Sequence, residues 1–580
     1  MKMERYGQAK SKAGSSLRLK SMMLFIRGRA AAAASRGQGG LGRRAQQANL
    51  QAAPPAAAME TAPPSPNTIP WTLFFTIFIT FVFLFMKKYL RKISPTHDHK
   101  LPPGPWNLPI VGSMHHLAGE ILTRRLHRLA KTYGPILRFK LGERNFISIT
   151  SPELAKEILK THDKIFANRP PDLMIGTYIF YNNTDLVFAP YGKYWTEVRK
   201  LCTIYLFTNK RISSFAQIRH EVSRYLVERI RAAEGASPVN MSDLFFEASY
   251  LTIVRSAFGS KGGDNVDLLG FFEAVKETFK LAGGFNLQDL FPSLRFLGDY
   301  TGMRAKMKRI HSKMEKICND AIEMHRRKNV AEGDPDEDLL DVLLRIQKEG
   351  ALDIPFTMDN VKAILTYWPA NFSFLILQDF FLGGTETTAT NWEWILTELV
   401  RHPDIMKKAQ LEIRNAFNGK SNIEESDFHT LPYLNMIIKE SLRLHPPAPF
   451  LIPRYCYESC EIGGYTIPAG YRVMVNIWSI LRNPESWDEP EIFRPERFQD
   501  NPYDLGLTNF DYLPFGGGRR TCPGISYGMR SLTNVLANVL YHFDWKPPGG
   551  KRPEELDADE TLGIGLTRKN VLWLIGTPHK

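Results

Sequence analysis

Residues 515–524 read FGGGRRTCPG, and this stretch decides the fold. Three consecutive glycines allow tight or left-handed backbone and let the main chain approach a flat ligand closely. Cys522 lies just before a helical run, GISYGMRSLTNVLANVLYHF at 524–543. We therefore expect its sulfur near a helix N-terminus, where free N–H groups and the helix dipole stabilise a thiolate. A lone cysteine is most often simply a buried one, but such a residue would not need these glycines and arginines.

The composition fits a folded protein with a large core, because 43% of the 580 residues are apolar and 12% aromatic. The cysteines are odd in number and thinly spread, which excludes a disulfide framework and fits a reducing compartment. They are Cys202, Cys318, Cys456, Cys460 and Cys522. Most of the formal charge of +14 comes from residues 1–58, which hold eleven Lys or Arg and one acid. The remainder is nearly balanced, so we expect no nucleic-acid partner.

The N-terminal region predicts a membrane anchor. Residues 1–58 read either as an organelle transit peptide or, as we favour, as an extension upstream of Met59 that is outside the working protein. Residues 69–86, IPWTLFFTIFITFVFLFM, carry no charge and nearly span a bilayer as a helix. Residues 87–105 form a basic, Pro-rich linker, whose lysines and arginines place the C-terminal body in the cytosol.

Residues 106–580 read as one catalytic domain, since no internal repeat or second linker divides them. Helical periodicity predominates, and strand-like pieces are short. Helices are predicted over 151–161, 217–233, 300–328 and 391–417, and strands within 136–150 and 460–477. The fold class is therefore mainly α with small β-sheets, and no alternating βα pattern suggests a dinucleotide-binding sheet.

Residues 515–524 resemble the haem-binding signature of the cytochrome P-450 superfamily, FxxGxRxCxG. All five fixed positions match: Phe515, Gly518, Arg520, Cys522 and Gly524. The resemblance implies the cytochrome P-450 fold behind a single transmembrane helix. It also implies haem b (iron protoporphyrin IX) as cofactor, with Cys522 as the axial metal ligand and the other four residues in the cofactor-binding segment.

Further motifs of this family appear in the expected order. Glu440 and Arg443 lie three apart on one helical face, and Arg497 follows in PERF. The resemblance makes these three a structural triad that braces the haem-binding region. Trp195 and Arg199 match a WxxxR helix, and Arg454 follows in LIPR. The resemblance makes these residues ligands of the haem propionates, a task that suits the always-charged arginine fork.

The segment GGTETT at 383–388 resembles the family's oxygen-activating helix. Small residues there loosen the helix ladder and leave room beside the backbone. The resemblance makes Glu386 and Thr387 catalytic: Thr387 donates a hydrogen bond where oxygen is activated, and Glu386 relays protons inward. On its own, a Thr-rich helix weakened by glycine would read equally well as structural.

One departure from the family pattern precedes this motif. About twelve residues, Thr366–Leu377, look inserted. An unbroken helix over 360–401 would be roughly 63 Å long and would contain Pro369. We therefore expect a break near Trp368 and Pro369, with the inserted segment either looped out or marking an aberrant chain that holds haem poorly.

The resemblance is closest to plant microsomal enzymes of specialised metabolism. It implies a monooxygenase that inserts one oxygen atom from O2 into a lipophilic small molecule, a terpenoid first and a phenolic or alkaloid next. It further implies electrons from NADPH through a separate reductase, with the catalytic domain on the cytosolic face of the endoplasmic reticulum membrane, or in plastids if residues 1–58 are a transit peptide. Two alternatives stay open: a haem isomerase or dehydratase of the same fold, and an inactive splice product. Both Glu386 and Thr387 are present, which speaks against the first.

Overall fold

The structure is a computed structural model of the chain. It describes residues 100–579 except 234, 236, 263–267, 283–285, 297–299, 328–333, 335–336, 350–367, 419–422, 501–502, 504, 506–508 and 564, together with 73, 75–77 and 79–80. The chain divides into two compact units, Met1–Asp98 and His99–Lys580. The second unit contains every residue of the site described below.

Most of the expected anchor at 69–86 lies outside the described residues, as do the extension at 1–58 and the linker up to residue 99. The six described residues of the anchor are helical, with exposed side chains. Among the helices that the structure describes, none has the length and apolarity needed to cross a bilayer. The anchor therefore stays a prediction.

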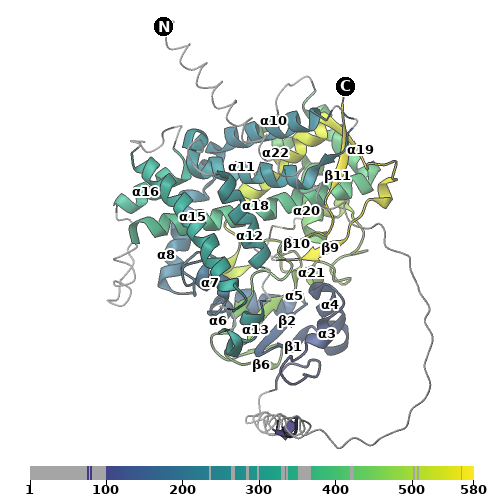
Figure 1. The fold of residues 1–580 in the computed structure, drawn as a ribbon. Helices are drawn as coiled ribbons and strands as arrows, with labels where there is room; N and C mark the ends of the chain where they lie inside the picture. Colours follow the sequence, from purple (N-terminus) through teal and green to yellow (C-terminus); the bar gives the residue numbers. More distant parts are fainter. Residues whose placement is uncertain are drawn as a thin grey trace, which may run out of the picture. The chain divides into compact units, whose positions relative to one another are not determined.

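Helices dominate the second unit, and Figure 1 shows most of its longer helices in the upper part of the ribbon, above the strands β1 and β2. The longer helices are α4 (Leu122–Tyr133), α8 (Lys193–Leu201), α10 (Ala216–Arg231), α11 (Met241–Gly262), α12 (Leu268–Ala282), α15 (Met303–Arg326), α16 (Leu339–Glu349), α18 (Trp368–Arg401), α19 (Pro403–Ala416), α20 (Pro432–Leu444) and α22 (Ile525–His542). The shorter ones are α3 (Met114–Leu117), α5 (Pro152–Lys156), α6 (Asp163–Phe166), α7 (Met174–Tyr178), α9 (Asn209–Ser214), α13 (Leu287–Leu290) and α21 (Ile477–Ile480).

The strands are short and form four small sheets. They are β1 (Ile136–Leu141), β2 (Arg144–Ile149), β3 (Val239–Asn240), β4 (Arg454–Tyr455), β5 (Cys460–Ile462), β6 (Tyr465–Ile467), β7 (Arg472–Val475), β8 (Phe543–Lys546), β9 (Glu560–Leu562), β10 (Leu566–Arg568) and β11 (Trp573–Pro578). The largest sheet has the order β1-β2-β7-β4, and only its β2–β7 pair is parallel. The predicted class, mainly α with small sheets, is confirmed.

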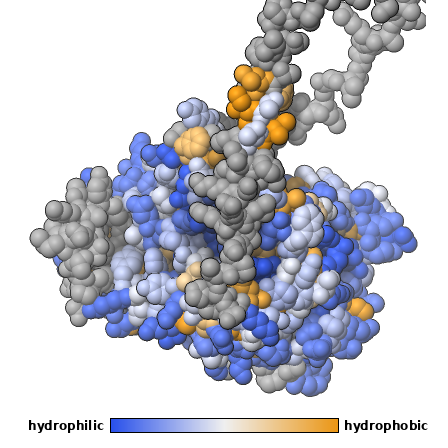
Figure 2. Space-filling view, turned by 90° about the horizontal axis from the view of Figure 1, so that it is seen from below, coloured by the Kyte–Doolittle hydropathy of each residue, from blue (hydrophilic) through white to orange (hydrophobic). Residues whose placement is uncertain are grey.

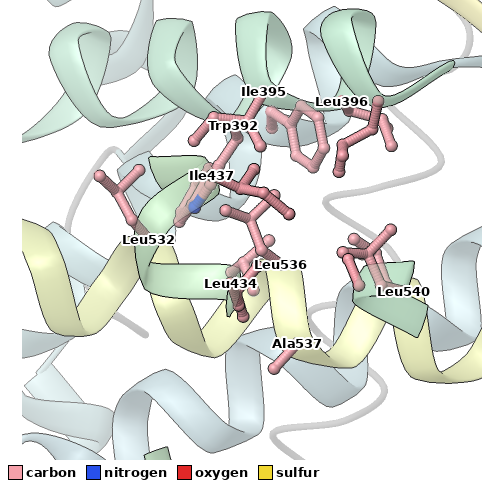
Figure 3. Close-up of a cluster of buried hydrophobic side chains, with 14 of the residues drawn as sticks. Trp392, Ile395, Leu396, Leu434, Ile437, Leu532, Leu536, Ala537 and Leu540 are labelled. Atoms are coloured by element: carbon pink, nitrogen blue, oxygen red, sulfur yellow. The ribbon is translucent and has the colours of Figure 1, made fainter. Parts of the chain in front are cut away.

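The core that positions the site forms where α18, α20 and α22 meet. Figure 3 shows Trp392 and Ile395 of α18 facing Leu434 and Ile437 of α20, with leucines of α22 such as Leu536 closing the cluster. All five side chains are fully buried. Burying such side chains stabilises the fold by about 1.5–3 kcal/mol each. The helix that follows Cys522 is thereby fixed against the helix that carries Glu386 and Thr387.

One long predicted helix is divided in the structure, and a proline explains the division. Periodicity predicted a helix over 391–417, but α18 ends at Arg401 and α19 begins at Pro403. Pro403 occupies the first position of α19, where its missing N–H costs nothing. The strands expected within 136–150 and 460–477 are present as β1, β2, β5, β6 and β7.

The inserted segment is part of a helix. Helix α18 begins at Trp368 and runs for 34 residues, so Pro369 stands in its first turn, and residues 350–367 lie outside the described part. Ile376 and Leu377, at the end of the insertion, are buried in the core. The expectation that the segment loops out is therefore wrong, because residues 368–377, ten of its twelve, belong to a helix that continues into GGTETT without a break.

The described surface is largely hydrophilic, as the face in Figure 2 shows. Large apolar side chains are exposed at a few places, among them Trp106, Ile110, Phe296 and Tyr300. Exposed apolar residues of this kind are common on protein surfaces and need no special function.

Candidate active site

The backbone closes residues 515–524 into a tight loop. The Cys522 N–H donates to the Phe515 carbonyl at 3.0 Å, and the Thr521 N–H donates to the Gly518 carbonyl at 3.1 Å. Gly518 has φ +70°, and a Cβ there would lie 2.0 Å from the Leu159 carbonyl oxygen. Only glycine fits this position, because both the left-handed backbone and the contact exclude a side chain. The loop thus presents Cys522 at a fixed place ahead of α22.

Cys522 sits two residues before Gly524, which caps the N-terminus of α22. Burial raises the pKa of its thiol, whereas the Gly524 N–H and the charge of Arg199 lower it. The effect of burial on this pKa thus outweighs that of the two groups that favour a thiolate. A metal cation bound to the Cys522 sulfur would lower the pKa of the thiol, because metal coordination deprotonates a thiol.

The structural triad forms one buried network. Arg443 donates to both oxygens of Glu440, at 2.7 and 2.9 Å, and Arg497 donates to Glu440 Oε1 at 3.0 Å. The Arg443 fork also binds the carbonyls of Leu481, Pro490 and Ile492. Because every charge is paired, the network tolerates complete burial of Glu440 and Arg443.

A cluster of four arginines flanks the loop: Arg169, Arg199, Arg454 and Arg520. Arg199 donates to the Thr521 carbonyl at 2.6 Å, and Arg454 donates to the Gly517 carbonyl at 2.9 Å. Arg454 also pairs with buried Asp163 at 2.9 Å. Among the residues that the structure describes, no other carboxylate forms an ion pair with any of the four. The cluster therefore has an excess of positive charge.

Burial and mutual repulsion make this excess costly. Burial, followed by the charge of Arg454, lowers the pKa of Arg520 to about 9. Burial, with repulsion from Arg520 and Arg454, also lowers the pKa of Arg169. An anionic ligand would relieve this repulsion, because a buried charge is stable only when it is paired.

Trp195 and Arg520 bind the same backbone carbonyl. The Trp195 indole N–H donates to the Leu186 oxygen at 2.9 Å, and Arg520 donates to it at 3.1 Å. The guanidinium of Arg520 also lies 4.2 Å from the centroid of the Trp195 ring. The structure thus brings these two predicted residues together on the loop Thr184–Ala189, hereafter the carbonyl loop.

The two glycines of α18 have different surroundings. A Cβ on Gly384 would lie 2.4 Å from Ile253 of α11, whereas a Cβ on Gly383 would meet nothing within 4 Å. The Gly384 carbonyl also accepts a hydrogen bond from Ser249. Gly384 therefore serves helix packing. Room beside the backbone, which the sequence predicted at both glycines, is present at Gly383.

Glu386 and Thr387 follow on the same helix. The Thr387 hydroxyl donates to the Gly383 carbonyl at 2.6 Å, which places it beside the open space. Burial raises the pKa of Glu386 to about 7. Glu386 Oε2 and the Thr385 hydroxyl are buried with no hydrogen-bond partner. Buried polar groups are usually paired, so these point to a ligand or water on this side.

The residues present fit haem. They offer a half-buried cysteine, an arginine cluster whose excess positive charge suits the carboxylates of haem, and an open face at Gly383 with buried polar groups beside it that have no partner among the described residues. When bound, haem supplies the redox-active iron at which O2 is reduced. The fold and the site together define a haem-thiolate protein.

Comparison with known proteins agrees. The family described as Cytochrome P450 matches residues 102–575, and the chain belongs to this family. It is a haem-dependent monooxygenase.

Relatives of known activity match over most of their length. Premnaspirodiene oxygenase of Hyoscyamus muticus is 44% identical over 494 residues, 84% of this chain and 95% of the relative. The 5-epiaristolochene 1,3-dihydroxylase of Nicotiana tabacum is 43% identical over 84% of this chain and 95% of the relative. Germacrene A hydroxylase of Barnadesia spinosa is 42% identical over 82% of this chain and 92% of the relative.

A solved structure supports the fold. Zebra fish cytochrome P450 in complex with progesterone is 25% identical to this chain, with a TM-score of 0.66. The match covers 80% of this chain and 100% of the zebra fish chain.

Sequence reasoning missed Asp163, Arg169, Asp185 and Asp379. Asp163 accepts hydrogen bonds from Arg454 and from the Arg519 N–H, and Arg169 binds three carbonyls around the cluster. Of these four residues, only Asp379 could have been noticed from its sequence surroundings. It is a lone acid inside the apolar run FSFLILQDFFLGG at 372–384.

Proposed function

We propose that this monooxygenase oxidises a terpenoid, and that Glu386 and Thr387 control proton delivery during the reaction. Support for the substrate class comes from the names of its relatives, whose substrates premnaspirodiene and germacrene A are terpenoid hydrocarbons. A second support is the apolar cluster that contains the residues of α18 just before Gly383. Ile179, Phe180, Phe380 and Phe381 are all buried in one apolar cluster. Apolar pockets with few polar groups suit such ligands.

The proposed roles of the chain's own residues follow from their positions. Cys522 holds the iron, and Arg199, Arg454 and Arg520 hold the haem carboxylates, with Trp195 supporting Arg520. The Thr387 hydroxyl can turn from the Gly383 carbonyl toward the open space and donate a hydrogen bond there. Glu386, with a pKa raised to about 7 by burial, can both accept and release a proton near neutral pH.

We propose further that electrons come from NADPH through a separate reductase at the endoplasmic reticulum membrane, with residues 69–86 as the anchor. The cytosolic orientation follows from the basic linker. Exposed cations close to the thiolate side support a docking face for the reductase: Lys193, Lys200, Lys210 and Arg519. If residues 1–58 are a transit peptide, the enzyme belongs in plastids instead.

The substrate proposal is tested with purified protein started at Met59, a plant reductase and NADPH. We expect at least one sesquiterpene hydrocarbon to yield an oxygenated product that carries label from ¹⁸O2. Phenolic and alkaloid panels serve as controls. Turnover confined to those panels would contradict the terpenoid assignment. Product formed without NADPH and without label would favour the isomerase or dehydratase alternative.

The inactive splice product is tested by deletion of Thr366–Leu377. Because Ile376 and Leu377 are buried within α18, we propose that the inserted segment belongs to the working fold. The parent chain should give the reduced carbon monoxide spectrum of a thiolate-ligated haem. If only the deletion variant gives that spectrum, the chain as it stands is an aberrant product.

A further inference from the structure

Two aspartates that the reaction does not use meet between α18 and the carbonyl loop. Asp379 Oδ2 of α18 accepts the Leu186 N–H at 2.7 Å. Asp185 Oδ2 accepts the N–H groups of Val187 and Phe188, each at 3.1 Å. Because Asp185 directly precedes Leu186, these hydrogen bonds bring the two carboxyl groups close together. The same short loop is thus held from both sides by carboxyl oxygens.

The remaining oxygens of the pair lack donors. Asp185 Oδ1 and Asp379 Oδ1 are both buried, and neither receives a hydrogen bond from an N–H or O–H group of the described residues. Two carboxylates at this distance would repel each other strongly in a site from which water is largely excluded. One proton held between them removes the repulsion and satisfies both oxygens at once.

The surroundings favour retention of one negative charge but not of two. Arg169 and Arg520, which donate to carbonyls of the carbonyl loop, bring positive charge close to Asp185. Tyr194 of α8 interacts electrostatically with both aspartates, and Cys202, the first residue of the π-helical segment Cys202–Leu206, interacts with Asp379. Both groups are neutral at physiological pH, since burial raises the pKa of each. Burial raises the pKa of Asp185, and burial together with the charge of Asp185 raises that of Asp379.

The carbonyl loop follows a strained segment of backbone and must be held in place by contacts. Tyr181, Asn182 and Asn183, which lead into it, have φ of +44°, +57° and +61°. Consecutive left-handed residues other than glycine store strain that the surroundings must offset. Leu186 then connects the two sides of the site: its N–H binds Asp379, and its carbonyl binds Trp195 and Arg520.

We propose that Asp185 and Asp379 share one proton and act as a positioning pair, which fastens the carbonyl loop to α18 and so holds Trp195 and Arg520 in place. The oxygen-activating helix and the arginine cluster are then mechanically linked through Leu186. That these arginines serve haem carboxylates rests on the proposed function. The shared proton does not.

The first test is infrared spectroscopy of the full holoprotein near neutral pH. A protonated carboxyl absorbs apart from carboxylates, so we expect such a band that shifts in D2O. It is recorded in a Glu386→Gln background, because Glu386, with its pKa raised to about 7 by burial, contributes a band of its own. Asp185→Asn and Asp379→Asn should each abolish that same band, because a shared proton needs both members. If the band is missing, or survives either substitution, the shared proton is refuted.

The second test is the pH dependence of thermal stability. The native pair binds a proton that the unfolded chain releases above about pH 4, so the pair's contribution to stability falls as the pH rises through its native pKa. In Asp379→Asn the side-chain amide donates a hydrogen bond to Asp185 in place of the shared proton, and this donor does not titrate. The melting temperature of this variant relative to the parent should therefore rise as the pH increases from about 4 to the raised native pKa of the pair. A constant difference would overturn the proposal.

A double-mutant cycle supplies the control. Asp185→Asn and Asp379→Asn should each remove the same pH-dependent contribution, and the double variant should remove no more. Asp289, another buried aspartate, accepts the Met174 N–H at 2.8 Å. Asp289→Asn should add to Asp379→Asn without coupling. Additivity within the proposed pair would contradict it.

Positioning is tested by haem retention. Asp379→Leu removes the acceptor for the Leu186 N–H, whereas Asp379→Asn keeps one. Transfer of haem to apomyoglobin should be faster from the Leu variant and close to the parent rate from the Asn variant. Equal rates from all three would refute the positioning role. If the parent binds no haem, the proposed function fails, but the infrared band and the pH dependence still decide the shared proton.

Discussion

The two sides of the site are built in opposite ways. On the thiolate side, backbone hydrogen bonds close the loop at 515–524, and Gly518 leaves no room for a Cβ. On the α18 side, Gly383 faces open space, and Thr385 and Glu386 keep buried polar atoms without partners. The comparison teaches that one side is fixed to hold a ligand, while the other retains unpaired groups for chemistry. Substitutions should accordingly affect cofactor binding on the first side and turnover on the second.

The largest expected effect comes from the network behind the thiolate side. Arg443→Ala leaves Glu440 buried without its main partner, which costs about 3–5 kcal/mol. That is a large fraction of a typical folding stability of about 5–15 kcal/mol. We expect little soluble holoprotein, as measured by haem content per chain. Arg326→Ala, which breaks an exposed pair with Glu323, is the control and should change stability by less than about 1 kcal/mol. Similar haem content in the two variants would contradict the bracing role.

A smaller effect is expected in the loop itself. Gly518→Ala forces a side chain into a left-handed conformation and against the Leu159 carbonyl, a strain of at least about 1–3 kcal/mol. Haem should dissociate faster and the melting temperature should fall. Gly528→Ala is a matched control, since nothing lies within 4 Å of a Cβ at that helical position. It should be neutral or stabilising by about 0.4–1 kcal/mol. If the two substitutions behave alike, the loop is less rigid than its contacts indicate.

On the α18 side the expected effect is on rate and not on stability. Glu386→Gln keeps the shape but removes a proton carrier, so turnover should fall by roughly a hundredfold. In the parent, the acid form of Glu386 delivers the proton, and activity should decline as the pH rises above about 7. The variant should lack this inflection while its haem content stays unchanged. Glu393→Gln lies on the same helix but contacts Arg568, and serves as the control. An inflection that persists in Glu386→Gln assigns the proton relay to another group.

The thiolate side could be predicted from the sequence because its residues are contiguous. FGGGRRTCPG contains the glycines, the arginine and the cysteine within ten positions, and hydrogen bonds between backbone groups of this stretch close the loop. The pairing of Glu440 with Arg443 was equally easy to predict, since three-residue spacing places the two side chains on one helical face. The bounds of α10 and α15 and the short strands within 136–150 and 460–477 also followed from local periodicity and turn residues.

What the sequence did not reveal depends on contacts between distant segments. Asp185 and Asp379 meet through tertiary packing, and neither residue's neighbours along the chain suggest a partner. The different tasks of Gly383 and Gly384 also became visible only once Ile253 of α11 was placed beside the second glycine. Similarly, the inserted segment was expected to loop out, but burial of Ile376 and Leu377 outweighs the irregularity of the pattern.

The account depends most directly on the sulfur of Cys522. Protein started at Met59 is purified with and without Cys522→Ser, and the reduced carbon monoxide difference spectrum of each is recorded. The parent should show the red-shifted band of a thiolate-ligated haem, and the serine variant should lose that band. An unchanged band in the serine variant would contradict the assignment of Cys522 as the iron ligand.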